Sequence, residues 1–76
     1  MDRPFKYDYG QTARIVTHAP AGFRSQERVA VVGMRVVRRK NEATAAGHSV
    51  GTHLYTVEYS DGSSVEIPEE YIEPAQ

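Results

Sequence analysis

The 76-residue chain contains no cysteine. It therefore has no disulfide bond, and it lacks a thiolate that would serve as a nucleophile or as a metal ligand. Its three histidines, His18, His48 and His53, do not follow the spacing of a zinc site. The sequence thus predicts a protein without a metal ion or another cofactor.

Long apolar runs are absent as well. The longest run, residues 29–34, has six residues, whereas a helix that crosses a bilayer needs about 20. The N-terminus lacks the apolar segment of a signal peptide. We therefore expect a cytoplasmic protein that does not contact a membrane.

Basic side chains are missing from the second half of the chain. Residues 1–40 carry all nine lysines and arginines and three acidic residues, a balance of +6, while residues 41–76 carry seven acidic residues and no basic one. Two interpretations are open. The halves either pair their charges within the fold, or they form faces that bind partners of opposite charge.

Alternation of apolar and polar residues predicts four to five short strands within a single domain, residues 1–76. The pattern in the first strand is carried by Phe5, Tyr7 and Tyr9. Gly33 interrupts the most apolar strand and predicts a bulge or bend there. The expected strands are residues 5–9, 12–17, 28–37, 54–60 and 63–67, after a frayed N-terminus at residues 1–4.

The connections between these strands also carry signals. Phe23 lies in a loop with proline and glycine and is expected to cover one end of the core. Residues 38–52 are polar and predict a long mobile loop. Asp61-Gly62 predicts a two-residue type I′ hairpin turn, and residues 68–74 predict a 3-10 turn. These elements predict an all-β fold, a small and strongly bent antiparallel barrel.

This plan resembles an SH3-like barrel, through Gly10, the kink at Gly33 and the closing segment 54–74. Small immunity proteins of bacterial polymorphic-toxin systems, of the type numbered thirty-one, are similar to the chain in residues 5–16, in Pro20, and in residues 31–33 and 55–57. That resemblance implies a protein that neutralises a cognate toxin by binding it.

The β-subunit barrel of nitrile hydratases also resembles the chain, in residues 18–24 and 54–59. In that family the metal ligands lie on the other subunit. The resemblance implies an accessory subunit of a larger complex, without catalysis of its own. The arginine-rich segment that this family carries after its proline loop is poorly matched.

Enzymatic activity is not expected, because the sequence has no nucleophile motif and no phosphate-binding glycine loop. Protein binding fits the acidic half best, since an acidic surface associates quickly with a basic cleft such as that of a nuclease toxin. Glu58 and Glu66 are expected side by side on the hairpin, at a cost in stability unless Arg14 or Arg28 pairs with them. The predicted partner-binding residues are Glu58, Tyr59, Asp61, Glu66, Glu69, Glu70, Tyr71 and Glu73.

Nucleic-acid or ribosome binding is the alternative, in the manner of Tudor-like barrels. Its basic run would contact phosphates, and four rings would stack on bases or form a cage. The isoelectric point of about 6.3 and the acidic half oppose it. In either case we expect a monomer or a dimer formed through an edge strand. The basic run is Arg35, Arg38, Arg39 and Lys40, and the rings are Tyr7, Tyr9, Phe23 and Tyr59.

Overall fold

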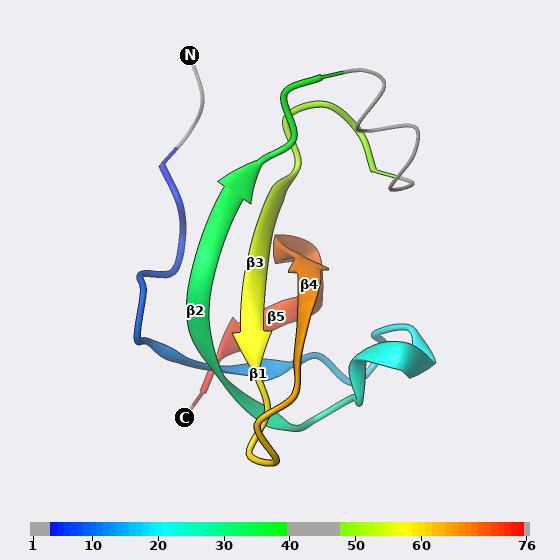
Figure 1. Cartoon of the computed structure of the whole chain (residues 1–76). Helices are drawn as coiled ribbons and strands as arrows, with labels where there is room; N and C mark the ends of the chain where they lie inside the picture. Colours follow the sequence, from blue (N-terminus) through cyan, green and yellow to red (C-terminus); the bar gives the residue numbers. More distant parts are fainter. Residues whose placement is uncertain (1–3, 40–47, 76) are drawn as a thin grey trace.

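The chain forms one five-stranded antiparallel sheet, in a computed structural model that describes residues 4–39 and 48–75. The strand order is β4-β3-β2-β1-β5, with β2 at the centre (Figure 1). The predicted all-β class is confirmed, and the number of antiparallel strands lies within the predicted four to five, although β5 lies within residues 68–74, where a 3-10 turn alone was predicted. The elements are β1 (Thr12–Ile15), η1 (Ala21–Phe23), β2 (Arg28–Val36), β3 (His53–Glu58), β4 (Ser64–Pro68), η2 (Glu69–Tyr71) and β5 (Ile72–Pro74), where η marks a 3-10 turn.

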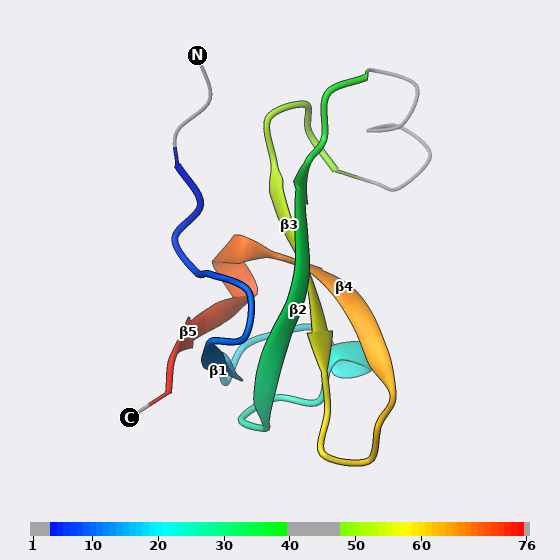
Figure 2. The same ribbon diagram turned by 60° about the vertical axis from the view of Figure 1, so that its left-hand side comes forward.

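The sheet bends at the predicted bulge in β2. The pairing of β2 with β3 shifts between Val31 and Gly33, because two residues of β2 there oppose one of β3. A Cβ on Gly33 would lie 3.4 Å from the side chain of Thr56, which is an ordinary van der Waals contact. The edge strands β4 and β5 are joined directly by η2 (Figure 2). The barrel stays open in its hydrogen bonding, since β4 and β5 are the two ends of the sheet.

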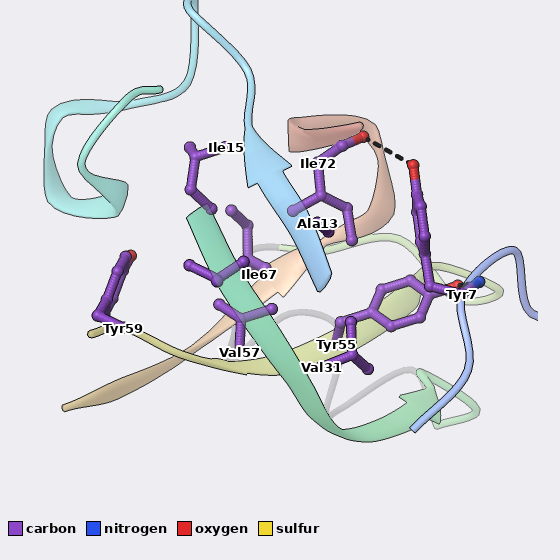
Figure 3. Close-up of a cluster of buried hydrophobic side chains, with 10 residues drawn as sticks. Tyr7, Ala13, Ile15, Val31, Tyr55, Val57, Tyr59, Ile67 and Ile72 are labelled. Atoms are coloured by element: carbon purple, nitrogen blue, oxygen red, sulfur yellow. Dashed lines mark hydrogen bonds between the residues drawn. The ribbon is translucent and has the colours of Figure 1, made fainter. Parts of the chain in front are cut away.

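The core lies inside this bend. Val31 faces Val57 across β2 and β3, and Tyr55 faces Ile67 across β3 and β4. All four side chains are fully buried, as expected for inward positions that alternate along each strand (Figure 3). Phe23 packs against this cluster, which confirms that its loop covers the core.

The predicted strand at residues 5–9 is wrong, because this segment is irregular. The backbone N–H groups of Lys6 and Tyr7 donate to the hydroxyl of Tyr55, at 2.9 and 3.3 Å, in place of a neighbouring strand. Tyr7 is buried, whereas Tyr9 is 73% exposed. The alternating rings therefore mark a segment that is anchored by side chains, and the sheet ends at β5.

The predicted type I′ turn between β3 and β4 is also wrong. Tyr59 N–H donates to the Ser63 carbonyl at 2.8 Å, and Gly62 N–H donates to the Tyr59 carbonyl at 3.0 Å. Gly62 has a φ of 88°, while Asp61 does not have a positive φ. This is the pattern of a three-residue loop with a glycine bulge. Asp61 stabilises it by accepting hydrogen bonds from the N–H and the hydroxyl of Ser63.

We expect Gly62→Ala to lower the free energy of unfolding by about 1–2 kcal/mol, the cost of a Cβ in the left-handed region. Nothing lies within 4 Å of that Cβ, so the cost is conformational. Gly22→Ala is the matched control, because Gly22 has the same open space without a positive φ. Urea unfolding measures both variants. Equal effects of the two substitutions would contradict the turn described here.

The segment between β2 and β3 is hydrogen-bonded at its base. Val37 N–H donates to the Thr52 carbonyl at 2.9 Å, and Gly51 N–H donates to the Val37 carbonyl at 2.7 Å. Most of the predicted mobile loop, residues 40–47, lies outside the described residues, as do residues 1–3 of the predicted frayed N-terminus. Within the described ranges, no helix is long and apolar enough to span a membrane.

Candidate protein-binding surface

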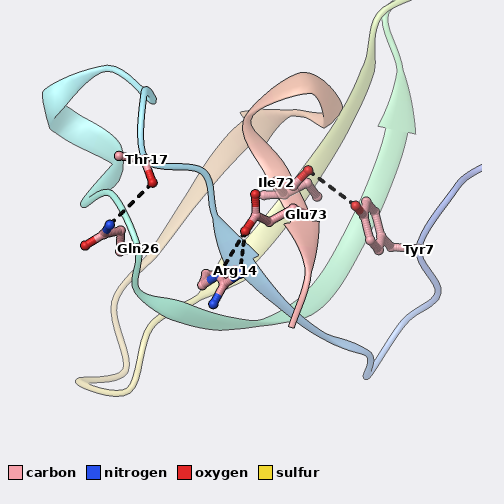
Figure 4. A network of polar contacts seen from close by, with 6 residues as sticks. All are labelled: Tyr7, Arg14, Thr17, Gln26, Ile72 and Glu73. Carbon is pink, nitrogen blue, oxygen red and sulfur yellow. Dashed lines mark hydrogen bonds and ion pairs between the residues drawn. The ribbon is translucent and has the colours of Figure 1, made fainter. Parts of the chain in front are cut away.

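Three of the predicted partner-binding carboxylates form ion pairs with arginines from the basic half of the chain. One pair joins β1 to β5 (Figure 4), a second joins the loop after η1 to the β3–β4 turn, and a third reaches from β2 across β3 to β4. The pairs are Arg14–Glu73 at 2.6 Å, Arg24–Asp61 at 2.9 Å and Arg35–Glu66 at 2.6 Å.

These contacts match three of the seven acidic residues in the second half of the chain with arginines of the first half. Arg35 donates two hydrogen bonds to Glu66 and thereby lowers the pKa of that carboxyl group. The pKa of Asp61 is lowered first by the hydrogen bonds from Ser63 and then by Arg24. Because the paired side chains are 38–54% exposed, solvent screens each pair and its contribution to stability is small. Each pair joins segments that are far apart in the sequence.

The expected repulsion on the hairpin is relieved in a different way from the predicted one. Glu66 faces Thr56 across the β3–β4 pair, and Glu58 faces Ser64, so the two carboxylates are diagonal neighbours. Arg35, and neither Arg14 nor Arg28, supplies the charge that pairs with Glu66. The expected repulsion between Glu58 and Glu66 is therefore no evidence for a binding function.

Three further predicted partner-binding residues stabilise the fold. Glu69 accepts a hydrogen bond of 2.6 Å from the hydroxyl of Tyr55. Tyr59 is buried and donates its hydroxyl to the Phe23 carbonyl at 2.7 Å. Tyr71 is half-buried, with its ring centroid 6.0 Å from that of Phe23. These side chains are thus engaged in internal contacts, and Glu69 and Tyr71 retain some exposed surface.

Two predicted carboxylates, Glu58 on β3 and Glu70 in η2, are exposed. Among residues 4–39 and 48–75, neither forms an ion pair. They are the negative charges of the predicted surface that the fold leaves unmatched. They lie on different elements, Glu58 on β3 and Glu70 in η2.

Glu58 lies on an open hollow on the outer face of the sheet. Thr12, Ala30, Glu58 and Ser64 are successive partners across β1, β2, β3 and β4, and they form one row of outward-facing residues. The hollow has a volume of about 350 Å³. Its lining consists of Thr12, Arg28, Val29, Ala30, Glu58, Tyr59, Ser60 and Gly62.

Sequence reasoning missed Thr12, Arg28, Ala30 and Ser60 as parts of a site. Each is unremarkable in its own strand or turn. They meet only through the register of three strands, and the bulge in β2 shifts that register by one residue. The alternation of β1 and β2 does predict that Thr12, Arg28 and Ala30 face outward, but it gives no sign of which residues oppose them.

The residues of the predicted basic run also differ in their surroundings. Arg35 is paired with Glu66, and Lys40 lies outside the described residues. Arg38 and Arg39 follow the end of β2 and are exposed. Among the four rings expected to stack on bases, Tyr9 is the exposed one, while Tyr7 and Tyr59 are buried and Phe23 is half-buried. The rings therefore do not line one open cage.

The arrangement offers hydrogen-bond acceptors and one carboxylate on a solvent-facing sheet. Within residues 4–39 and 48–75, no three histidine, aspartate or glutamate side chains gather in a way that would hold a metal ion.

No protein-family model, curated protein or solved structure matches the chain. The resemblances to immunity proteins and to nitrile hydratase barrels therefore stay predictions.

Proposed function

We propose that this chain is a non-enzymatic protein-binding module and that the outer face of its sheet, around Glu58, is the binding surface. The observation that carries the proposal is the contrast between Glu58 and the neighbouring carboxylates. Asp61, Glu66 and Glu73 are matched by arginines of the same chain, whereas Glu58 stands exposed at a hollow without an ion pair among the described residues. An unmatched charge beside a concave surface is available to a partner.

The specific form of this proposal is an immunity protein that neutralises a cognate bacterial toxin. Its support is the resemblance of residues 5–16, 31–33 and 55–57, together with the unmatched carboxylate of Glu58. A toxin that acts on nucleic acid has a basic cleft. Negative charges on the inhibitor would accelerate association with such a cleft.

We expect Glu58→Lys to abolish capture of the partner from a lysate of the native host, because a cation would then meet the basic surface of the partner. Glu70→Lys is the matched control, since it makes the same charge change at an exposed position on another element. The experiment compares tagged wild-type protein with both variants, before and after nuclease treatment. Reversal of Glu66 or Glu69 is less informative, because both carboxylates take part in internal hydrogen bonds.

A protein that is retained by the wild type and by Glu70→Lys, survives nuclease, and is lost with Glu58→Lys supports the proposal. Capture that is unchanged by Glu58→Lys contradicts it. Nucleic acid that is captured by the wild type and lost when Arg38 and Arg39 are replaced would establish the alternative. The exposure of these two arginines at the end of β2 is what favours that alternative.

A further inference from the structure

The Asp61-Gly62 peptide in the β3–β4 turn carries the groups for a spontaneous modification of the chain. A backbone nitrogen can attack the side-chain carboxyl carbon of an aspartate that precedes it, and glycine obstructs this attack least because it has no side chain. The turn is open to solvent, since the Asp61 side chain is 54% exposed and nothing lies within 4 Å of a Cβ placed on Gly62.

We propose that Asp61 is a site of isoaspartate formation and that the folded turn holds the reaction back. In this reaction the Gly62 nitrogen forms a bond to Cγ of Asp61, and the N–H proton and the carboxyl hydroxyl leave as water. The resulting succinimide ring takes up water again. Opening at its side-chain carbonyl returns aspartate, and opening at its backbone carbonyl gives isoaspartate. The proposal goes beyond the proposed function and does not depend on it.

Three donors hold the carboxyl group in its unreactive form. Ser63 donates to Oδ1 of Asp61 through its N–H at 2.9 Å and its hydroxyl at 2.6 Å, and Arg24 donates to Oδ2 at 2.9 Å. The bonds from Ser63, followed by that from Arg24, lower the pKa of Asp61 and keep the group ionised. Ring closure requires the protonated carboxyl group, because an oxide ion is a poor leaving group.

The attacking nitrogen is held as well. Gly62 N–H donates to the Tyr59 carbonyl at 3.0 Å, and this hydrogen bond must break before the nitrogen can attack Cγ. Tyr59 also positions Arg24, whose Cζ lies 4.4 Å from the centroid of the tyrosine ring. Because Tyr59 is buried, it anchors both groups to the core. The reaction therefore requires the turn to open.

The product would alter the surface beside Glu58. Isoaspartate adds a carbon atom to the backbone at position 61, so the hydrogen bonds that close this short turn cannot all be kept. Tyr59, Ser60 and Gly62 belong to the turn and line the hollow. Conversion thus changes the outer face of the sheet at its turn end.

The test compares the folded full chain with the same chain unfolded in guanidinium chloride, both in water that carries ¹⁸O. Uptake of ¹⁸O at Asp61 records ring opening, and resistance to a protease that cleaves before aspartate identifies isoaspartate. We expect conversion in the unfolded chain. In the folded chain it should be at least about tenfold slower, because a hydrogen bond to a charged group supplies roughly that factor.

Variants locate the cause in the turn. In the folded chain, Ser63→Ala should accelerate conversion by about fivefold or more, and Arg24→Ala, which removes an exposed ion pair, by about two- to fivefold. Ser64→Ala is the matched control and should have no effect, since Ser64 is an exposed serine on the adjoining strand β4. Urea unfolding verifies that each variant stays folded.

Equal rates in the folded and unfolded chains would overturn the proposal, as would an unfolded chain that forms no isoaspartate at Asp61. A folded-state rate that neither Ser63→Ala nor Arg24→Ala changes would also contradict it, because the donors would then not control the reaction. The same holds if Ser64→Ala accelerates conversion as much as Ser63→Ala.

Discussion

Ile67→Ala is expected to leave the protein largely unfolded at 25 °C. Removal of a buried isoleucine side chain beyond Cβ costs about 2–5 kcal/mol, and a single-core domain of this size has a total stability of only about 3–5 kcal/mol. Ile67 is fully buried and faces Tyr55 across β3 and β4, in the middle of the core. No disulfide is present to compensate for the loss.

Circular dichroism during urea unfolding measures this effect. Val50→Ala is the matched control, since Val50 is 55% exposed and a surface change of this kind alters stability by about 0.5 kcal/mol or less. A loss below about 1 kcal/mol in Ile67→Ala would contradict the position of the core, because such a small value is typical of a partly exposed side chain.

Tyr55→Phe is expected to destabilise the protein by about 1–3 kcal/mol, although it removes a single oxygen atom. That hydroxyl accepts hydrogen bonds from the N–H groups of Lys6 and Tyr7 and donates one of 2.6 Å to Glu69. Its loss leaves two backbone donors and a carboxylate without these partners. The irregular N-terminal segment should then detach from the core, because the hydroxyl of Tyr55 replaces the strand pairing that this segment lacks.

The same hydroxyl predicts how stability depends on pH. Burial and the hydrogen bond to Glu69 raise the pKa of Tyr55 from 10.0 to about 12. Between these values the unfolded chain releases a proton that the folded protein retains, so unfolding becomes easier as the pH rises. The contribution of this pKa shift to the free energy of unfolding is fully present below pH 10. About 2–3 kcal/mol of that free energy is lost as the pH rises to 12. The raised pKa values of Tyr7 and Tyr59 add to this decline.

Urea unfolding at pH 8 and pH 11.5 tests both statements about Tyr55. Tyr55→Phe should be less stable than the wild type at pH 8 and should lose less stability on the way to pH 11.5. Tyr9→Phe is the control, since Tyr9 is 73% exposed. If Tyr55→Phe lost as much stability as the wild type between pH 8 and pH 11.5, the loss would have to come from the titration of another group.

The strands β2, β3 and β4 were predictable because their alternation reflects burial on one face. Tyr55, Val57 and Tyr59 recur at every second position, and all three are in the core. Gly33 marked the bulge, since the register of β2 against β3 shifts between Val31 and Gly33. A structural feature can be predicted from the sequence when the residues that cause it lie in the same strand or in the strand that pairs with it.

The errors arise from side-chain hydrogen bonds that neither the apolar alternation nor the Asp-Gly pair indicates. The rings of Phe5 and Tyr7 alternate like those of a strand, but their segment is bound by the hydroxyl of Tyr55, which is 48 residues away from Tyr7. The hairpin turn was assigned from Asp61-Gly62, while Ser63 decides its form by donating two hydrogen bonds to Asp61. Local propensity does not report such side-chain partners.

The candidate site was predictable only in part. Glu58 was among the predicted partner-binding residues, and so were Asp61, Glu66 and Glu73, which pair with arginines at sequence separations of 31 to 59 residues. Net charge per half of the chain does not reveal these pairs, because antiparallel strands interleave distant segments. The hollow around Glu58 arises from the same interleaving.

Hydrogen exchange on the complex with the captured protein tests the binding surface most directly. Backbone amides of residues 28–30 and 58–62 should exchange more slowly in the complex than in the free chain, because the partner covers the outer face of the sheet around Glu58. Protection confined to Arg38 and Arg39 at the end of β2, with no change around Glu58, would contradict the binding surface proposed here.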